Sequence, residues 1–338
     1  MSASRTIVVA GAGAVGRTVG YGLARAGHAV TVVDPDPEGA NASRIAAGML
    51  APAFEALFDG GRYELLRDAL GLWPALAREL GLRIAWDGAM AVGTQAEAEA
   101  WALDLAALGA AAELRHLEED RWAVFCEADR QLDPNTALQA LRWAAEGLGV
   151  RFATGRVTGF ADGVAGIDGA DVLAADILVI ATGAGQDLAA LAPELGHLTP
   201  VKGHILRAGN AYSGVPVVRG RDIYLCRTPQ GTFLGATMEI GRADTEVDPL
   251  AVEGLLERAG ALAGGLDRLG WTASAGVRAA TPDGLPMVGE GRAPGVILAV
   301  GARRNGWLLA PLIAEVLLDA IEGQPKSPAA ELFDPHRF

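Results

Sequence analysis

The chain begins with a strand, a glycine-rich turn, a helix and a second strand that ends in an acidic residue. Residues 6–10 form an apolar run, and the motif Gly11-Ala-Gly-Ala-Val-Gly16 follows it directly. A helical pattern then extends to about residue 26, and the apolar residues 30–33 stop at Asp34. This succession is the dinucleotide-binding fingerprint in the structural context that it requires. The sequence therefore predicts a Rossmann-type unit at the N-terminus.

The glycines and the acid of this motif have separate tasks. Gly11 permits a tight turn, Gly13 lets the backbone approach a pyrophosphate, and Gly16 lets the helix pack closely against the strand. The helix N-terminus offers free N–H groups to the anion. Asp34 is placed to accept a hydrogen bond from a ribose hydroxyl. We expect a bound dinucleotide here, and the alternative is a glycine-rich turn without a ligand.

Composition and charge limit the kinds of molecule that this protein is expected to bind. The 338 residues are 51% hydrophobic and carry a formal net charge of −13, which argues against nucleic acid or an anionic membrane surface as a partner. We see no secretory signal and no apolar stretch of the roughly 18 residues that a membrane span needs. The two cysteines, Cys126 and Cys226, are expected to be buried and unpaired, so the expected location is a reducing cytoplasm. The five histidines have no spacing that predicts a metal site.

Segments with an α/β pattern alternate along the chain with segments of an α+β pattern. We expect a nucleotide-binding domain made of residues 1–50, 134–196 and 279–338, and a substrate-binding domain made of residues 51–133 and 197–278. Such interleaving favours a flavin, because nicotinamide enzymes usually place one domain after the other.

Three local predictions concern the candidate site. One strand is expected over residues 149–160, and a short strand over residues 272–277 with Arg278 just after it. A helix is expected over residues 307–322, directly after Arg304-Asn-Gly306. Since the first N–H groups of a helix have no partner within it, this helix should present partial positive charge to a ligand. The alternative is a helix start that an ordinary loop caps.

Motifs spread over nearly the whole chain resemble those of one family. They are Gly11-Ala-Gly-Ala-Val-Gly16, Ser43 with Ala46-Ala-Gly-Met-Leu50 and Glu55, Pro200-Val-Lys-Gly203, Tyr224, Gly235-Ala-Thr-Met238, Ala275-Gly-Val-Arg278, Pro282-Asp-Gly-Leu-Pro286, and Gly301 with Arg304-Asn-Gly306. In this order they resemble the glycine oxidase branch of the D-amino-acid-oxidase (DAO) superfamily of FAD-dependent oxidoreductases. The resemblance implies an α/β fold of the glutathione-reductase-2-like kind. In it, a Rossmann-type FAD-binding domain is interleaved with an α+β substrate domain that has an antiparallel or mixed sheet and helices.

The resemblance also implies FAD as the cofactor. Some relatives tether the flavin to a cysteine, but Gly276 stands at the matching position, so FAD is expected without a covalent link. The implied FAD contacts extend from the first turn to the last long helix: Gly11, Gly13, Ala14, Val15, Gly16, Asp34, Ser43, Ala46, Ala47, Gly48, Met49, Val157, Thr182, Gly183, Arg278, Gly301, Arg304, Asn305, Gly306 and Trp307. A reduced flavin carries negative charge at one edge, which the N-terminus of the last long helix is suited to stabilise.

The same resemblance implies four residues around an amino acid substrate. Arg278 and Tyr224 match the pair that binds the substrate carboxylate. Met238 matches a pocket methionine, and Arg304 is a second arginine that is expected near the flavin. An arginine suits the first task because its planar guanidinium can bind both carboxylate oxygens. The implied reaction passes hydride from the substrate α-carbon to flavin N5 and gives an imine, then a keto acid and ammonia, while O2 becomes H2O2.

Several alternatives stay open at the level of sequence. Asp222 stands where glycine oxidases carry a histidine, which puts glycine in doubt against another small D- or N-methyl amino acid. A dehydrogenase of the same fold would pass electrons to a quinone or a protein in place of O2. A nicotinamide enzyme and a tRNA-modifying flavoprotein are further readings, and the acidic charge argues against the second. The family supplies imine for thiamine biosynthesis and forms homo-oligomers, so a dimer or a tetramer is open here.

Overall fold

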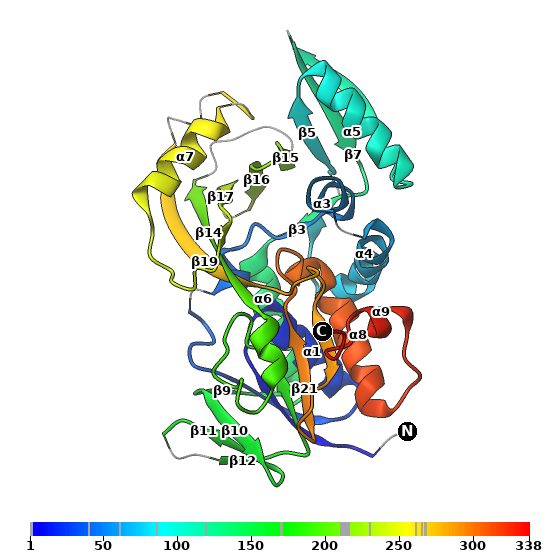
Figure 1. Ribbon diagram of the computed structural model, residues 1–338, viewed down its shortest axis with the longest axis vertical. Coiled ribbons are helices and arrows are strands. Elements are labelled where there is room, and N and C mark those ends of the chain that lie inside the picture. Colours follow the sequence, from blue (N-terminus) through cyan, green and yellow to red (C-terminus); the bar gives the residue numbers. More distant parts are fainter. Residues whose placement is uncertain are drawn as a thin grey trace.

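The arrangement of the chain is given by a computed structural model, which describes residues 3–39, 41–60, 62–85, 87–118, 120–169, 172–209, 217–229, 231–260, 262–264, 266 and 269–338. Within these residues, two large sheets organise the molecule, and helices pack against both (Figure 1). Two smaller three-stranded sheets accompany them.

The first large sheet contains the N-terminal strand. In the described residues it has the order β20 (Met287–Glu290), β21 (Val296–Val300), β13 (Ile177–Ile180), β1 (Thr6–Ala10), β2 (Ala29–Asp34) and β9 (Arg151–Thr154). Its strands are parallel except for β20. Along β1, Ile7 and Val9 point into one buried cluster, and Val8 and Ala10 point into another on the opposite face. Burial on both faces explains why this run is apolar throughout.

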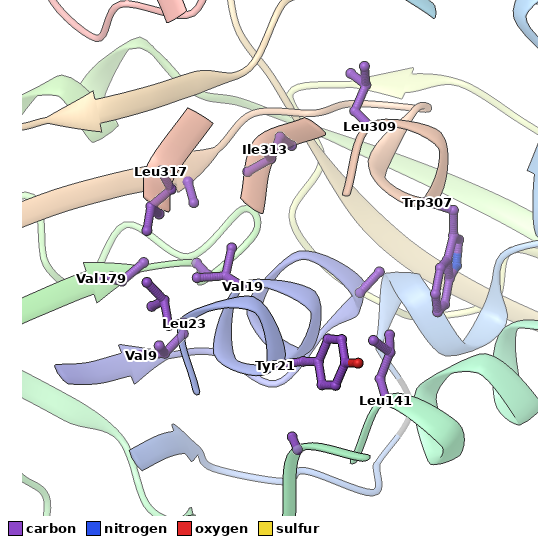
Figure 2. Close-up of a cluster of buried hydrophobic side chains, with 14 of the residues drawn as sticks. Val9, Val19, Tyr21, Leu23, Leu141, Val179, Trp307, Leu309, Ile313 and Leu317 are labelled. Atoms are coloured by element: carbon purple, nitrogen blue, oxygen red, sulfur yellow. The ribbon is translucent and has the colours of Figure 1, made fainter. Parts of the chain in front are cut away.

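Helices cover one face of this sheet. They are α1 (Ala14–Arg25), α4 (Tyr63–Glu79), α6 (Pro134–Gly147) and α8 (Gly306–Glu322). Figure 2 shows Val19 and Leu23 of α1 together with Ile313 and Leu317 of α8 in one apolar cluster above the strands. The indole of Trp73 in α4 donates to the Leu308 carbonyl at 3.2 Å. These contacts hold α8 against α1 and α4. The opposite face is covered by β10 (Val157–Ala161), β11 (Val164–Ile167), β12 (Val172–Ala174) and the 3-10 helix η1 (Pro193–His197).

The second large sheet is mixed but mainly antiparallel. In the described residues its order is β18 (Glu239–Ile240), β14 (Thr199–Ala208), β17 (Gly231–Gly235), β16 (Tyr224–Thr228), β15 (Val217–Arg219), β5 (Ala89–Gly93), β7 (Arg121–Cys126) and β6 (Glu113–Glu118), with β19 (Thr272–Ala280) also paired to β14. Only the β15–β5 pair is parallel among these described pairings. Leu225 of β16 packs toward α7 (Pro249–Ala259), whereas Tyr224 and Cys226 face the cluster that holds α5 (Gln95–Ala107). The alternation of β16 thus turns Tyr224 away from α7.

Short elements connect the two sheets. They are α2 (Ala42–Ile45), β3 (Met49–Leu50), α3 (Pro52–Asp59), β4 (Ile84–Ala85) and β8 (Arg130–Leu132), whereas α9 (Pro328–Leu332) follows α8 and packs on the cluster of the first sheet. Asp129 fixes the start of α3, because its carboxylate accepts from the N–H groups of Ala53 at 3.0 Å and Phe54 at 3.3 Å. Among the described residues, no helix combines the length and the apolar character that crossing a bilayer requires.

The predicted fold class is confirmed, and two local predictions are wrong. Residues 149–160 do not form one strand, since the chain turns at Gly155 (φ +152°) and divides into β9 and β10 in different sheets. Arg278 lies inside β19, because the pairing of β14 with β19 continues past Val277 to Ala280. Both cysteines are buried and free. The division into two domains stays a prediction, with α4 of the second part packed against α8 of the first.

Candidate active site

A cavity of about 710 Å³ lies between the second large sheet, the α2–β3 segment and the start of α8. Ten of the predicted FAD and substrate contacts line it, as does Asp222: Ala46, Ala47, Gly48, Met49, Tyr224, Met238, Arg278, Arg304, Asn305 and Trp307. They come from the α2–β3 segment, the second large sheet and the start of α8. The fold thus gathers segments that are more than 250 residues apart at one site.

A second cavity, of about 140 Å³, lies at the carboxyl ends of β1 and β2. Four of the predicted nucleotide contacts line it, namely Gly11, Asp34, Val157 and Thr182. The N-terminus of α1 lies between the two cavities, where the Ser43 hydroxyl accepts from the Ala14 N–H at 2.9 Å. Ser43 is the neighbour of Ala42, which lines the larger cavity. A dinucleotide fits this arrangement, with a group in each cavity and its phosphates at the helix start.

The glycines of the first motif permit the close packing that the sequence predicts. Gly11 has φ +113°, and a Cβ there would lie 2.3 Å from the Ala181 carbonyl oxygen. A Cβ at Gly16 would lie 1.9 Å from the Gly11 carbonyl oxygen. Asp34 shapes the turn as well as lining the cavity, since its carboxylate accepts from the Ala12 N–H at 2.8 Å. The turn therefore has the form that a bound nucleotide needs.

Eight predicted FAD contacts line neither of these two cavities: Gly13, Ala14, Val15, Gly16, Ser43, Gly183, Gly301 and Gly306. The first five lie at the α1 start between the cavities. Gly301 packs against Thr281, because a Cβ at Gly301 would lie 2.7 Å from the Thr281 methyl carbon. Roles for these residues stay predictions.

Arg278 reaches the larger cavity because its guanidinium lies over Gly203 of the neighbouring strand β14, which has no side chain. A Cβ on Gly203 would lie 2.2 Å from Nη1 of Arg278. This nitrogen donates to the Thr237 carbonyl at 3.3 Å and lies 3.5 Å from the Met238 sulfur. Arg278 forms no ion pair with any carboxylate of the described residues. Burial lowers its pKa from the ordinary arginine value, so an anion that enters the cavity would relieve an unbalanced charge.

Tyr224 presents its hydroxyl to the same cavity. The side chain is 7% exposed, and a Cβ on Gly235 would lie 2.6 Å from its hydroxyl oxygen. Burial raises the pKa of Tyr224 to about 12. The hydroxyl therefore keeps its proton at neutral pH and can donate a hydrogen bond to a bound anion.

A buried carboxylate, Glu55 of α3, lies between two arginines of the cavity. Its Oε1 accepts from Nη2 of Arg219 at 2.8 Å, and its Oε2 lies 3.2 Å from Nε of Arg304. Burial alone would raise the pKa of Glu55, but the two arginines lower it below the ordinary value. Arg304, which the sequence placed near the flavin, is thus already paired. The sequence did not indicate Arg219, whose signal is an arginine at the end of an otherwise apolar strand.

The start of α8 opens toward the cavity as predicted. Asn305 occupies the N-cap position, and no side chain of the described residues caps the helix there. Asn305 and Trp307 both line the cavity, and the Trp307 indole donates to the Ser43 carbonyl at 3.1 Å. The positive end of the helix dipole is therefore available to a ligand. In the described part of the chain, no cluster of acidic, histidine and cysteine side chains is arranged to hold a metal ion.

Comparisons with known proteins agree with this geometry. Residues 6–320 match the family described as FAD dependent oxidoreductase (DAO). The bifunctional protein ThiO/ThiG of Nostoc sp. is 31% identical over 98% of this chain, which spans 54% of that protein's length. Glycine oxidase of Geobacillus kaustophilus is 28% identical and is covered over 92% of its length by 94% of this chain. Its crystal structure superposes over 100% of both chains with a TM-score of 0.87 and 26% identity.

The family match and the site agree on the cofactor. The glycine-rich turn, the two cavities and the uncapped α8 start are features that FAD requires. The chain therefore belongs to the DAO family of FAD-dependent oxidoreductases, and FAD is its cofactor.

Proposed function

We propose that this protein oxidises glycine or another small D- or N-methyl amino acid with FAD, giving an imine that hydrolyses to a keto acid and ammonia, or methylamine from an N-methyl substrate, while O2 is reduced to H2O2. One observation carries the proposal. Arg278 faces the cavity without a carboxylate partner among the described residues, whereas Arg219 and Arg304 share Glu55. A substrate carboxylate would supply the missing partner. The similarity to glycine oxidases supports the same assignment.

The chain's own residues bind and orient the substrate in this proposal. Arg278 holds the carboxylate with two N–H donors, and the Tyr224 hydroxyl donates a third hydrogen bond. Fixing the carboxylate orients the α-carbon, and much of the rate in such a site comes from orientation. Met238 lies beside Arg278 and bounds the side-chain space with a flexible thioether. Arg304, held by Glu55, adds positive potential without competing for the substrate.

FAD would extend from the second cavity to the larger cavity. Gly11, Asp34, Val157 and Thr182 would hold its adenosine half, and the α1 start would hold its phosphates. Ala46, Ala47, Gly48, Met49, Asn305 and Trp307 would contact the isoalloxazine. When bound, FAD accepts the two electrons and the hydrogen that leave the substrate α-carbon. The N–H groups at the α8 start are positioned to stabilise negative charge that arises beside them.

The experiment is a peroxide-coupled screen of glycine, sarcosine, D-alanine, D-proline and larger D-amino acids, with flavin reduction followed separately. Flavin reduction together with H2O2 supports an oxidase. Reduction without H2O2 assigns the dehydrogenase alternative, and no reduction by any amino acid refutes the proposal. The Arg278→Ala variant should raise KM severely with the flavin spectrum nearly unchanged, and an unchanged KM would remove Arg278 from the site.

The biological setting belongs to the same proposal. The product imine suits thiamine biosynthesis, which is the role of this branch of the family. The two buried free thiols, Cys126 and Cys226, suit a reducing cytoplasm. Size-exclusion chromatography with light scattering tests whether the protein is a dimer or a tetramer.

A further inference from the structure

The larger cavity continues beyond the residues that would hold a small amino acid. Its lining includes residues 236–239, between β17 and β18, and residues of α7, the helix beside β14 and β17 in Figure 1. We call this extension the α7 arm and define it by Gly220, Ile223, Asp248, Leu250, Ala251 and Arg258. Glycine needs none of these residues, because it has no side chain or nitrogen substituent to place among them.

The arm is long enough for a substantial substituent. Ala251 and Arg258 are seven residues apart on α7, which places them on the same face of the helix about 10 Å apart along its axis. Apolar side chains border the near part. Leu250 is 76% exposed yet lines the cavity, and Ile223 forms part of the same lining. An exposed leucine at a cavity wall offers contact area for an aliphatic stem.

The arm, as defined, holds one acidic and one basic side chain, Asp248 and Arg258. Asp248 caps the start of α7, where its carboxylate accepts from the Leu250 N–H at 2.9 Å. The Glu239 carboxylate lies 2.8 Å from Nδ1 of His204, whose Nε2 accepts from the Asp248 N–H. Arg258, at the end of the arm, forms no ion pair with a described carboxylate. An anionic group on the substrate would therefore give Arg258 the partner that it lacks among the described carboxylates.

We propose that the preferred substrate is an amino acid that carries, on its nitrogen or its α-carbon, an aliphatic chain ending in a carboxylate. The amino acid carboxylate binds Arg278, the chain lies along Leu250 and Ala251, and the terminal carboxylate pairs with Arg258. This inference rests on the proposed function and extends it from small amino acids to a class with two carboxylates. The chemistry at the α-carbon is unchanged, so no further reactant is needed.

The test compares substrates that differ only in the chain. N-(4-carboxybutyl)glycine and D-2-aminopimelate carry the same terminal acid on nitrogen and on carbon, so their comparison assigns the point of attachment. Sarcosine, D-alanine and the terminal amides of both acids serve as short and neutral references. The wild-type holoenzyme should show, for one of the two acids, a kcat/KM about threefold to fivefold higher than for its amide and at least tenfold higher than for its short reference.

Variants of α7 locate the effect. Ala251→Trp fills the arm and should lower the ratio of kcat/KM for the long acid to that for the short reference at least tenfold. Arg258→Gln should lower it about threefold to fivefold, because an exposed ion pair contributes little. Glu257→Gln, at an exposed position of the same helix outside the cavity, is the matched control. Binding of (4-carboxybutyl)thioacetate and methylthioacetate, which lack the amine, gives the same ratio by calorimetry without turnover.

The outcomes separate this inference from the function beneath it. Oxidation of the short amino acids with equal or lower kcat/KM for both long acids overturns the inference alone. An unchanged ratio in folded, flavin-loaded Ala251→Trp overturns it as well. If no amino acid, short or long, reduces the flavin, the proposed function falls and the inference falls with it.

Discussion

Gly203→Ala is predicted to disable substrate binding without altering any charged residue. The added Cβ would lie 2.2 Å from Nη1 of Arg278, whereas ordinary contacts begin near 3.4 Å. Because the obstructed atom is the end of a flexible side chain, the guanidinium moves by about 1 Å while β14 and β19 keep their pairing. The methyl group thus tests the position of Arg278 separately from its charge.

The size of the effect follows from the contact that is lost. A hydrogen bond to a charged group contributes about 1.5–3 kcal/mol, and about 1.4 kcal/mol corresponds to a factor of ten. A displacement of 1 Å in an active site can also cost about a hundredfold in rate. We therefore expect Gly203→Ala to raise KM for the best amino acid roughly tenfold to a hundredfold, while the flavin spectrum and content stay those of the wild type.

The assay is steady-state oxidation together with spectral titration of the holoenzyme by methylthioacetate, a carboxylate that is not a substrate. Gly71→Ala in α4 is the control, since a Cβ there meets nothing within 4 Å and should leave KM unchanged. A Gly203→Ala protein with bound flavin and with both KM and the methylthioacetate Kd within twofold of wild type would refute the carboxylate role of Arg278.

Three further predictions concern the surroundings of the site. Glu55→Gln leaves Arg219 and Arg304 without their shared charge and should lower the free energy of unfolding by about 3 kcal/mol, which chemical denaturation measures; a loss below about 0.5 kcal/mol would contradict it. Burial raises the pKa of Asp129 to about 7, so the folded state retains a proton that the unfolded state has lost between about pH 4 and pH 7, and stability falls as pH rises through this window. Asp129→Asn should therefore gain stability relative to wild type as pH rises from about 4 to 7, by about 1.4 kcal/mol for each pKa unit of the shift, and parallel stability curves would refute this. Burial raises the pKa of Cys126 to about 11 and of Cys226 to about 12, so neither thiol should react with a disulfide reagent at pH 8 until the protein is unfolded; rapid labelling of the native protein would contradict their burial.

The sequence predicts best those parts of the site that local backbone geometry determines. The turn from Gly11 to Gly16 and the start of α8 each lie within one short segment, and their structure follows from glycine positions and helix ends. Strand boundaries depend on the partner strand. The local apolar pattern ends at Val277, so the sequence predicts Arg278 just after its strand. In the structure the ten-residue partner β14 extends the ladder past this point, and Arg278 lies within β19.

The sequence does not show which charged residues pair when they are far apart along the chain. Glu55 pairs with Arg219 and Arg304, which are 164 and 249 residues away, and nothing in an acidic residue's own segment identifies such partners. A weaker signal is present, since Glu55 interrupts the apolar helix α3 and Arg219 ends an apolar strand. A charged side chain in such a setting needs a buried partner. The sequence could thus indicate that a pair exists, but only the fold shows which residues form it.

This pairing explains how the cavity keeps two positive sites distinct. If Arg304 were unpaired, it would compete with Arg278 for the substrate carboxylate, and the substrate would bind in two orientations. Glu55 reduces that competition, because its carboxylate lies 3.2 Å from Nε of Arg304 and accepts a hydrogen bond from Nη2 of Arg219 at 2.8 Å. In the proposed function, the substrate carboxylate would bind Arg278, which forms no ion pair with a carboxylate of the described residues, and negative charge on the reduced cofactor would lie at the N–H groups of α8. The substrate carboxylate and the reduced cofactor would thus each have a separate positive partner. Because these partners lie at different places in the cavity, they would orient the α-carbon between them.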